Sequence, residues 1–270
     1  MIRNDSKQST FDLERYLDNS RKVEIADLDF SKARDYPLSS SEIRCLSYMM
    51  DVESHTIHYL RGLMKTCAVR DPDTVAFLNC WAYEEFFHGR AIRKFLSAAG
   101  IEFPATRIQE VDQRRTWREG IGELGSSLLC YVVKDFHAVY LAWGAIQELS
   151  ALEAYGVIAK RTRNPILAEL LRRIAKDERR HFSFYFNKAR PLLESRSAQA
   201  LTRIILRHFW TPVGGGLKPD HDVQWTMRFV FGNSEGRSAA QRIDSVIARL
   251  PGQNWFNLLS SLQGLATEES

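Results

Sequence analysis

Apolar residues recur every three or four positions along four long segments of the chain, which are separated by stretches rich in polar residues, proline or glycine. This interval places apolar side chains on one face of an α-helix. Three or four shorter segments with the same pattern follow residue 191. No segment shows a strong alternation of single apolar and polar residues, the pattern of half-buried β-strands. The sequence therefore predicts an all-α protein.

Capping signals mark the start of three of the four long helices. At each of these starts, a residue of a type that caps helix N-termini is followed by a glutamate at the third helical position or by a proline at the first.

The apolar stripe of the first helix is expected to pass through Met50, Ile57 and Met64. The second helix is expected to run to Gly100, and the third to cover about residues 126–160. The capping pairs are Ser39 with Glu42, Asp71 with Pro72, and Asn164 with Pro165.

The connection between the second and third helices, about residues 101–124, is long and charged, whereas its neighbours are short. Short loops join antiparallel helices, and one long crossover is the arrangement of ferritin-like four-helix bundles. We therefore expect a single ferritin-like domain over residues 1–270. A lead-in of 1–38 precedes a four-helix core of 39–190, and additional helices form a C-terminal extension of 191–270.

Carboxylates and imidazoles lie in phase with the apolar residues of all four long helices. Two of these helices carry the motif Glu-x-x-His, whose first and fourth side chains are neighbours on one helical face. Each of the other two carries a single glutamate in phase. The six residues are Glu53 in the first helix, Glu85 and His88 in the second, Glu148 in the third, and Glu178 and His181 in the fourth.

Four carboxylates that face one interior repel one another, and burial of each unpaired charge costs several kcal/mol. Two divalent cations would remove this cost. One glutamate from each of two helices, with Glu-x-x-His from each of the other two, is the ligand set of ferritin-like di-iron proteins. Imidazole with carboxylate suits iron or manganese. The sequence therefore predicts two metal ions, iron in the active form with manganese as an alternative, bound by these six residues.

Other readings of these residues remain. A single Glu-x-x-His motif is common by chance, and a lone buried glutamate is more often a hydrogen-bonded structural residue. A metal-free structural bundle is disfavoured by the cost of burying four carboxylates. Asp177 is expected either to orient a metal-binding histidine or to be solvated, and the spacing fits both equally. Glu84 and Glu153 are off the ligand face, so we expect a solvated or indirect role for each.

Composition excludes several classes of function. The net charge of +4, from 37 basic and 33 acidic residues, is too small and too dispersed to indicate nucleic-acid binding. The four cysteines form no C-x-x-C pair, which disfavours a zinc site or a disulfide framework. No stretch resembles a signal peptide or approaches the roughly 18 apolar residues of a membrane span. We expect a cytoplasmic protein with no nucleic-acid partner and no membrane span.

Three stretches, "WAYEEFFHG", "IQELSALEAYGVIAKR" and "IAKDERRH", resemble helices of the soluble acyl-[acyl-carrier-protein] desaturases. The resemblance covers residues 45–190. It implies a non-haem di-iron centre that activates O2, is reduced by a ferredoxin-type donor and removes two hydrogens from an acyl chain on acyl-carrier protein or a related thioester. It also implies a homodimer. In that family Glu53 and Glu148 would be terminal ligands, and Glu85 and Glu178 would bridge the metals.

The sequence departs from the family at one position. Family members commonly have threonine three residues after the glutamate of the third helix, where this chain has Ala151 beside Ser150. A di-iron hydroxylase or oxidase of secondary metabolism therefore remains an alternative. A third alternative is an iron-storage or peroxide-detoxifying ferritin-like protein. Ile174 stands where the related arylamine N-oxygenases add a histidine, which argues against that activity.

Basic residues of the fourth helix form a candidate docking patch for an acidic carrier protein. Arg172, Lys176, Arg179 and Arg180 fall largely off the ligand face, so we expect them to face outward. A solvated helix face is the simpler interpretation of the same residues.

Overall fold

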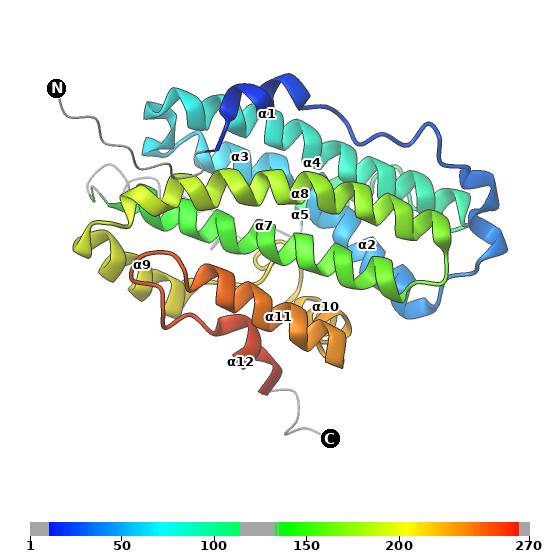
Figure 1. Ribbon diagram of the computed structural model, residues 1–270. Helices are drawn as coiled ribbons and strands as arrows, with labels where there is room; N and C mark the ends of the chain where they lie inside the picture. Colours follow the sequence, from blue (N-terminus) through cyan, green and yellow to red (C-terminus); the bar gives the residue numbers. More distant parts are fainter. Residues whose placement is uncertain (1–10, 114–132, 134, 265–270) are drawn as a thin grey trace.

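The computed structural model describes residues 11–113, 133 and 135–264 (Figure 1). These residues form helices and contain no β-strand, which confirms the predicted all-α bundle. No helix among them combines the length and the apolar character that crossing a membrane requires. The four long helices are α2 (Ser40–Ser54), α4 (Pro72–Ala98), α7 (Phe136–Arg161) and α8 (Pro165–Leu192).

The capping residues act as the sequence predicts. Ser39 and Glu42 form a reciprocal capping box at the start of α2. Asp71 accepts a hydrogen bond from the backbone of Asp73 at the start of α4, and Asn164 accepts two at the start of α8. Helix α4 ends at Ala98, just before Gly100, whose φ of 89° suits glycine. The predicted start of the third helix lies largely outside the described residues.

The long helices pack as two pairs, α2 with α4 and α7 with α8, and α4 also contacts α8. Close approach within the second pair depends on Gly144, where an added Cβ would lie only 2.4 Å from the ring of Tyr185. Side chains between the helices are fully buried. Phe77, Ile92 and Leu171 are each 0% exposed. The apolar faces identified in the sequence therefore meet in one core.

The first long helix is interrupted, which corrects the prediction of one continuous stripe. Helix α2 ends at Ser54, His55 adopts φ −105° and ψ 8°, and α3 (Thr56–Leu63) begins after it. The ring of His55 is buried and contacts the carbonyl groups of Asp51 and Ile108. The break shifts the helical phase, so Ile57 is 59% exposed instead of lying in the core.

Shorter elements cover the bundle. The N-terminal segment holds α1 (Leu13–Asn19) and the 3-10 turn η1 (Phe30–Asp35), and both contact α4. A second 3-10 turn, η2 (Cys67–Arg70), follows α3. The crossover contains α5 (Arg107–Gln113), and a two-pronged ion pair between Arg107 and the buried Asp51 holds it to α2.

The C-terminal helices form an additional layer along α7 (Figure 1). Helices α9, α10 and α11 contact α7, and α10 also contacts α2. Helix α12 packs on α11. Their bounds are α9 (Arg196–Phe209), α10 (Asp220–Phe231), α11 (Ser234–Ile247) and α12 (Leu258–Gly264).

Candidate metal centre

The four long helices bring all six predicted ligands to one place inside the bundle. Every one of these residues is buried, with exposures of 0–7%. Their ligand atoms form two groups, and within each group the atoms all lie within 4.8 Å of one another. The first group contains Glu53, Glu85, His88 and Glu178, and the second contains Glu85, Glu148, Glu178 and His181.

Glu85 and Glu178 belong to both groups, so they lie between the two clusters of ligand atoms. Each group also holds the Nδ1 atom of one histidine. His88 Nδ1 lies 3.3 Å from Glu178 Oε1 and 3.8 Å from Glu53 Oε2. His181 Nδ1 lies 2.9 Å from Glu85 Oε1 and 3.5 Å from Glu148 Oε2. The arrangement is that of two adjacent sites that share two carboxylates.

The second ring nitrogen of each histidine, Nε2, contacts the acidic residue that precedes the other Glu-x-x-His motif. His88 Nε2 lies 3.2 Å from Asp177 Oδ2, and His181 Nε2 lies 2.8 Å from Glu84 Oε2. When Nε2–H donates to a carboxylate, the lone pair of Nδ1 is left for a metal ion. The structure therefore places Asp177 beside an imidazole, the first of its two expected roles. Glu84, which is 0% exposed, does the same for the other histidine.

Arg180 contacts both of the carboxylates that lie against the histidine Nε2 atoms, here called the outer carboxylates Asp177 and Glu84. Its Nη2 atom lies 2.7 Å from Asp177 Oδ1 and 2.8 Å from Glu84 Oε1. Helix α1 and the segment after it complete the network. The hydroxyl of Tyr16 in α1 donates to Glu84 Oε2 at 2.9 Å, and the backbone N–H of Arg21 donates to Glu84 Oε1. The outward-facing role expected for Arg180 is therefore wrong, since its guanidinium points at these two carboxylates.

The sequence analysis missed Tyr16 and Arg180, and for Glu84 it left an indirect role open beside a solvated one; the contact with His181 fits the indirect role. A signal for Glu84 was present, because both Glu-x-x-His motifs are preceded by a second acidic residue. On a helix wheel that residue is about 100° from the ligand face and would be exposed on an isolated helix. Packing of α1 against α4 buries it. The pairing of each outer carboxylate with the other motif depends on how α4 and α8 face each other.

Three of the four carboxyl groups resist ionisation. Burial, reinforced by the charge of Glu178, raises the pKa of Glu85 to about 8. Burial also raises the pKa of Glu148 to about 8, although a hydrogen bond with His181 opposes the shift. Burial and the neighbouring Glu85 raise the pKa of Glu53 well above its usual range. Burial therefore favours the protonated, uncharged form of these three carboxyl groups.

The fourth carboxyl group and the imidazoles behave in the opposite way. Burial disfavours the charged form of Glu178, but the adjacent imidazoles of His181 and His88 hold its pKa below the usual range. Burial likewise opposes a charged imidazole, yet Asp177 and Glu178 raise the pKa of His88 to about 10. Protons on the imidazoles therefore supply the positive charge in this cluster. Divalent cations at the same place would displace them.

Four of the candidate donor atoms are buried and lack hydrogen bonds. Glu53 Oε2, Glu85 Oε1, His88 Nδ1 and Glu178 Oε1 have no hydrogen-bond partner. An unsatisfied buried polar atom costs about 1–3 kcal/mol, and more when it is charged. Four such atoms converging on one point fit a metal ion, which would bind all of them at once. The residues present could therefore hold a metal ion.

The remaining candidates from the sequence lie elsewhere. Glu153 forms an ion pair with Arg242 at 2.6 Å near the surface, away from the cluster. Arg172 is exposed and pairs with Glu169 of its own helix at 3.0 Å. Ala151 lines a cavity beside Glu53.

The structure is a helical bundle with a buried cluster of four glutamates and two histidines that could hold a metal ion. The fatty acid desaturase family model matches residues 18–208, which include all four long helices. The chain belongs to this family. Membership supports a desaturase-type oxidoreductase. No curated protein matches the chain.

Proposed function

We propose that the protein is an O2-dependent, non-haem di-iron oxidoreductase that desaturates an acyl chain held as a thioester. The observation that carries the proposal is the sharing of Glu85 and Glu178 between two groups of closely spaced, buried ligand atoms. A single-ion site needs no such overlap. Family membership supports acyl-chain desaturation as the reaction type.

In this proposal Glu53 and His88 would hold one iron, Glu148 and His181 would hold the other, and Glu85 and Glu178 would serve both. The assignment follows the composition of the two groups. Carboxylate oxygens and imidazole nitrogens suit iron, with manganese as a second choice. Two bound iron ions would supply the O2-dependent two-electron oxidation that desaturation requires.

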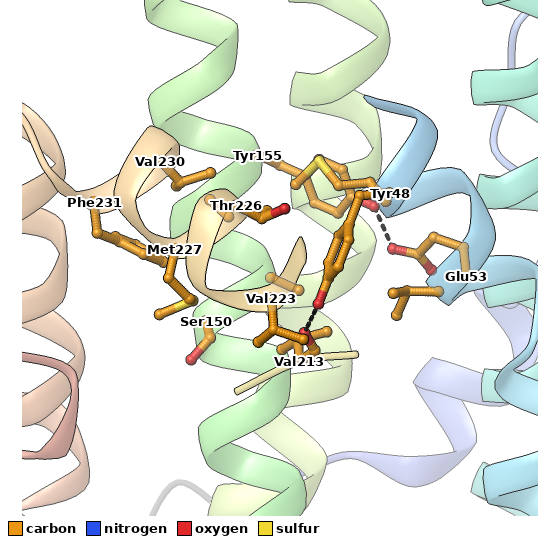
Figure 2. Close-up of a pocket in the computed structure, with 14 residues that line it drawn as sticks. Tyr48, Glu53, Ser150, Tyr155, Val213, Val223, Thr226, Met227, Val230 and Phe231 are labelled. Atoms are coloured by element: carbon orange, nitrogen blue, oxygen red, sulfur yellow. Dashed lines mark hydrogen bonds between the residues drawn. The ribbon is translucent and has the colours of Figure 1, made fainter. Parts of the chain in front are cut away.

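The protein's own residues would orient the ligands and exclude water. Tyr155 donates its hydroxyl proton to Glu53, which directs the carboxylate (Figure 2). Aromatic rings cover the histidine side of the cluster. Phe77 stacks on Phe184 with centroids 3.7 Å apart, and Tyr16 and Phe77 both contact the ring of His181. This cover keeps bulk water from the ligands and strengthens electrostatic interactions inside.

The substrate class follows from the family and from the surroundings of the cluster. An apolar cavity borders Glu53, and it suits an alkyl chain better than a polar molecule. We infer that the chain is presented by acyl-carrier protein or as a related thioester such as that of coenzyme A. The sequence has no cysteine cluster to supply electrons, so we infer a separate ferredoxin-type donor. A cytoplasmic homodimer remains our expectation.

A turnover assay tests the proposal. Iron-loaded protein is incubated with ferredoxin, its reductase, NADPH and acyl-carrier protein charged with long-chain acids, and the released acids are analysed by mass spectrometry. A loss of two hydrogens is expected. O2 consumption without any change in the acyl chain would reject this substrate class. The same incubation without iron is the control.

Hydroxylation of the acyl chain is the second candidate reaction, and the position of Ala151 supports it. This residue lines the cavity beside Glu53, so its methyl group stands where the family commonly places a hydroxyl. The same assay separates the two reactions, because hydroxylation adds one oxygen atom to the acyl chain. Uptake of many iron ions per chain, with no acyl product, would indicate the storage alternative instead.

A further inference from the structure

The cavity beside Glu53 is built partly by the C-terminal layer. It has a volume of about 50 Å³, and its walls come from α2, α7, α10 and the segment around Val213. Helix α10 and Val213 follow residue 208, where the family match ends. The wall that faces the predicted metal ligand Glu53 across the cavity is thus contributed by the part of the chain outside that match.

Four hydroxyl groups line this cavity, and three of them donate hydrogen bonds to acceptors in the protein. Tyr48 donates to the carbonyl of Val213, Ser150 to the carbonyl of Ile146, and Tyr155 to Glu53. The fourth is Thr226 Oγ1, which is buried and has no hydrogen-bond partner. Figure 2 shows Thr226 on α10, facing Tyr155 and Tyr48 across the cavity.

Packing alone does not explain a threonine at this position. Valine has the same shape, and the neighbouring wall positions of α10 are Val223 and Val230. Thr226 is 7% exposed, so its hydroxyl is removed from bulk water without a compensating bond. A water molecule in the cavity would need two to four polar partners. The other three hydroxyl protons that line the cavity are already engaged.

We propose that this cavity binds the segment of the acyl chain nearest the metal centre, and that Thr226 selects a chain bearing one hydrogen-bonding group, such as a hydroxyl, at that segment. The inference rests on the proposed function for the acyl substrate. The apolar walls, which include Met49, Val52 and Met227, accommodate the methylene groups on either side. Thr226 is therefore a specificity-determining residue supplied by the C-terminal layer.

A site that hydrogen-bonds a substrate hydroxyl rejects the analogue that lacks it, because the protein group is then left unpaired. We expect at least one positional isomer of a hydroxylated acyl chain to bind about tenfold more tightly than the plain chain, a difference of about 1.4 kcal/mol. Thr226→Val is expected to abolish this preference, and Thr226→Ser to retain most of it.

The probes are acyl pantetheine thioesters of equal length, either saturated or hydroxylated at successive positions. Their binding to the iron-loaded full chain is measured anaerobically by isothermal titration calorimetry. Thr202→Val is the matched control, because Thr202 is also fully buried, its hydroxyl also lacks a partner, and it does not line the cavity. It should leave every affinity unchanged.

Equal affinities for plain and hydroxylated chains, or a preference that survives Thr226→Val, would overturn the proposal. Iron content and the optical spectrum are recorded for every variant. Normal iron loading with desaturation of plain chains, but no hydroxyl preference, leaves the proposed function standing and rejects the role of Thr226. If no acyl thioester binds, both the proposed function and the role of Thr226 are rejected.

Discussion

Glu84 contacts His181, the histidine of the other Glu-x-x-His motif, with its Oε2 atom 2.8 Å from the imidazole Nε2. Asp177 holds His88 in the same crossed manner at 3.2 Å. Each Glu-x-x-His motif therefore supplies a histidine and a glutamate that belongs to both groups of ligand atoms, and the acidic residue before it contacts the histidine of the other motif. Neither motif completes a site alone.

This crossed pairing predicts a selective loss of metal. Glu84→Gln removes the charge behind His181, and Asp177→Asn removes the charge behind His88. Each change should weaken the binding of the ion that its histidine holds by about 10–100-fold, the usual effect of altering a carboxylate behind a ligand. Mössbauer spectroscopy with isotopically enriched iron distinguishes the two environments.

The control for these variants is Glu169→Gln. Glu169 lies on α8, outside the cluster, and pairs with Arg172 and Arg173. It should bind iron as the wild type does. Equal and small losses in Glu84→Gln, Asp177→Asn and the control would show that the outer carboxylates do not orient the histidines.

Loss of a shared carboxylate should remove both ions. Glu178→Ala deletes a residue that belongs to both groups of ligand atoms. We expect iron content to fall from about two ions per chain to less than one and activity to vanish. Iron is measured by plasma emission spectrometry after anaerobic loading. Glu153→Ala, which breaks only the ion pair with Arg242, should keep its iron. Full iron content in Glu178→Ala would mean that the site lies elsewhere.

Metal binding should stabilise the fold. Buried carboxylates with raised pKa values lose their unfavourable environment when cations bind, and the unfolded chain offers no such site. Free ion at 100 times its dissociation constant adds about 2.7 kcal/mol per site. We therefore expect ferrous iron to raise the melting temperature by roughly 5–10 °C over chelator-treated protein, measured anaerobically by calorimetry.

A charge-removing variant sharpens this test. Glu85→Gln keeps the shape of the side chain but removes one of the repelling carboxylates. The chelator-treated variant should be as stable as the wild type or more so, whereas iron should stabilise it much less. A chelator-treated wild type that melts at the same temperature as the iron-loaded protein would contradict the metal assignment.

Gly89 sets the distance between α2 and α4 at the cluster. An added Cβ would lie 2.6 Å from Ser54 Oγ and 3.2 Å from Glu53 Cβ. Gly89→Ala should therefore push α2 outward and displace Glu53, at a cost of about 1–3 kcal/mol in unfolding free energy. We expect weaker iron binding in a folded protein. Gly156→Ala, where an added Cβ meets nothing within 4 Å, is the control: it should leave iron binding unchanged and should not lower the unfolding free energy, because alanine favours a helix interior.

Carrier docking should depend on salt if the exposed cations of α8 form the docking patch. Arg172, Lys176 and Arg179 remain exposed, whereas Arg180 does not belong to the patch. Affinity for an acidic carrier should fall steeply as the Debye length shortens from about 30 Å at 0.01 M salt to about 10 Å at 0.1 M. Reversal of the three charges to glutamate should remove most of this dependence, measured by surface plasmon resonance.

Arg237→Glu on α11 is the control for the corresponding single variant Arg179→Glu, because it makes the same charge change at an exposed residue of a different helix. A carrier affinity that does not change with salt, or that survives reversal of the three charges, would leave these residues as a solvated helix face.

The sequence by itself determined the helical class, the capped starts of α2, α4 and α8, and the six in-phase polar residues. These features are local, because helical periodicity and capping depend on residues within a few positions of one another. The phase of Glu85 with His88, and of Glu178 with His181, follows from helix geometry whatever the rest of the chain does.

Tertiary structure decided what depends on how helices meet. A helix wheel cannot show that α1 buries Glu84 or that Arg180 turns inward, because both effects arise from contacts between segments far apart in the chain. The interruption at His55 depends on contacts that include Ile108 of the crossover. The unpaired hydroxyl of Thr226 acquires its position beside the centre only because α10 packs across α2 and α7.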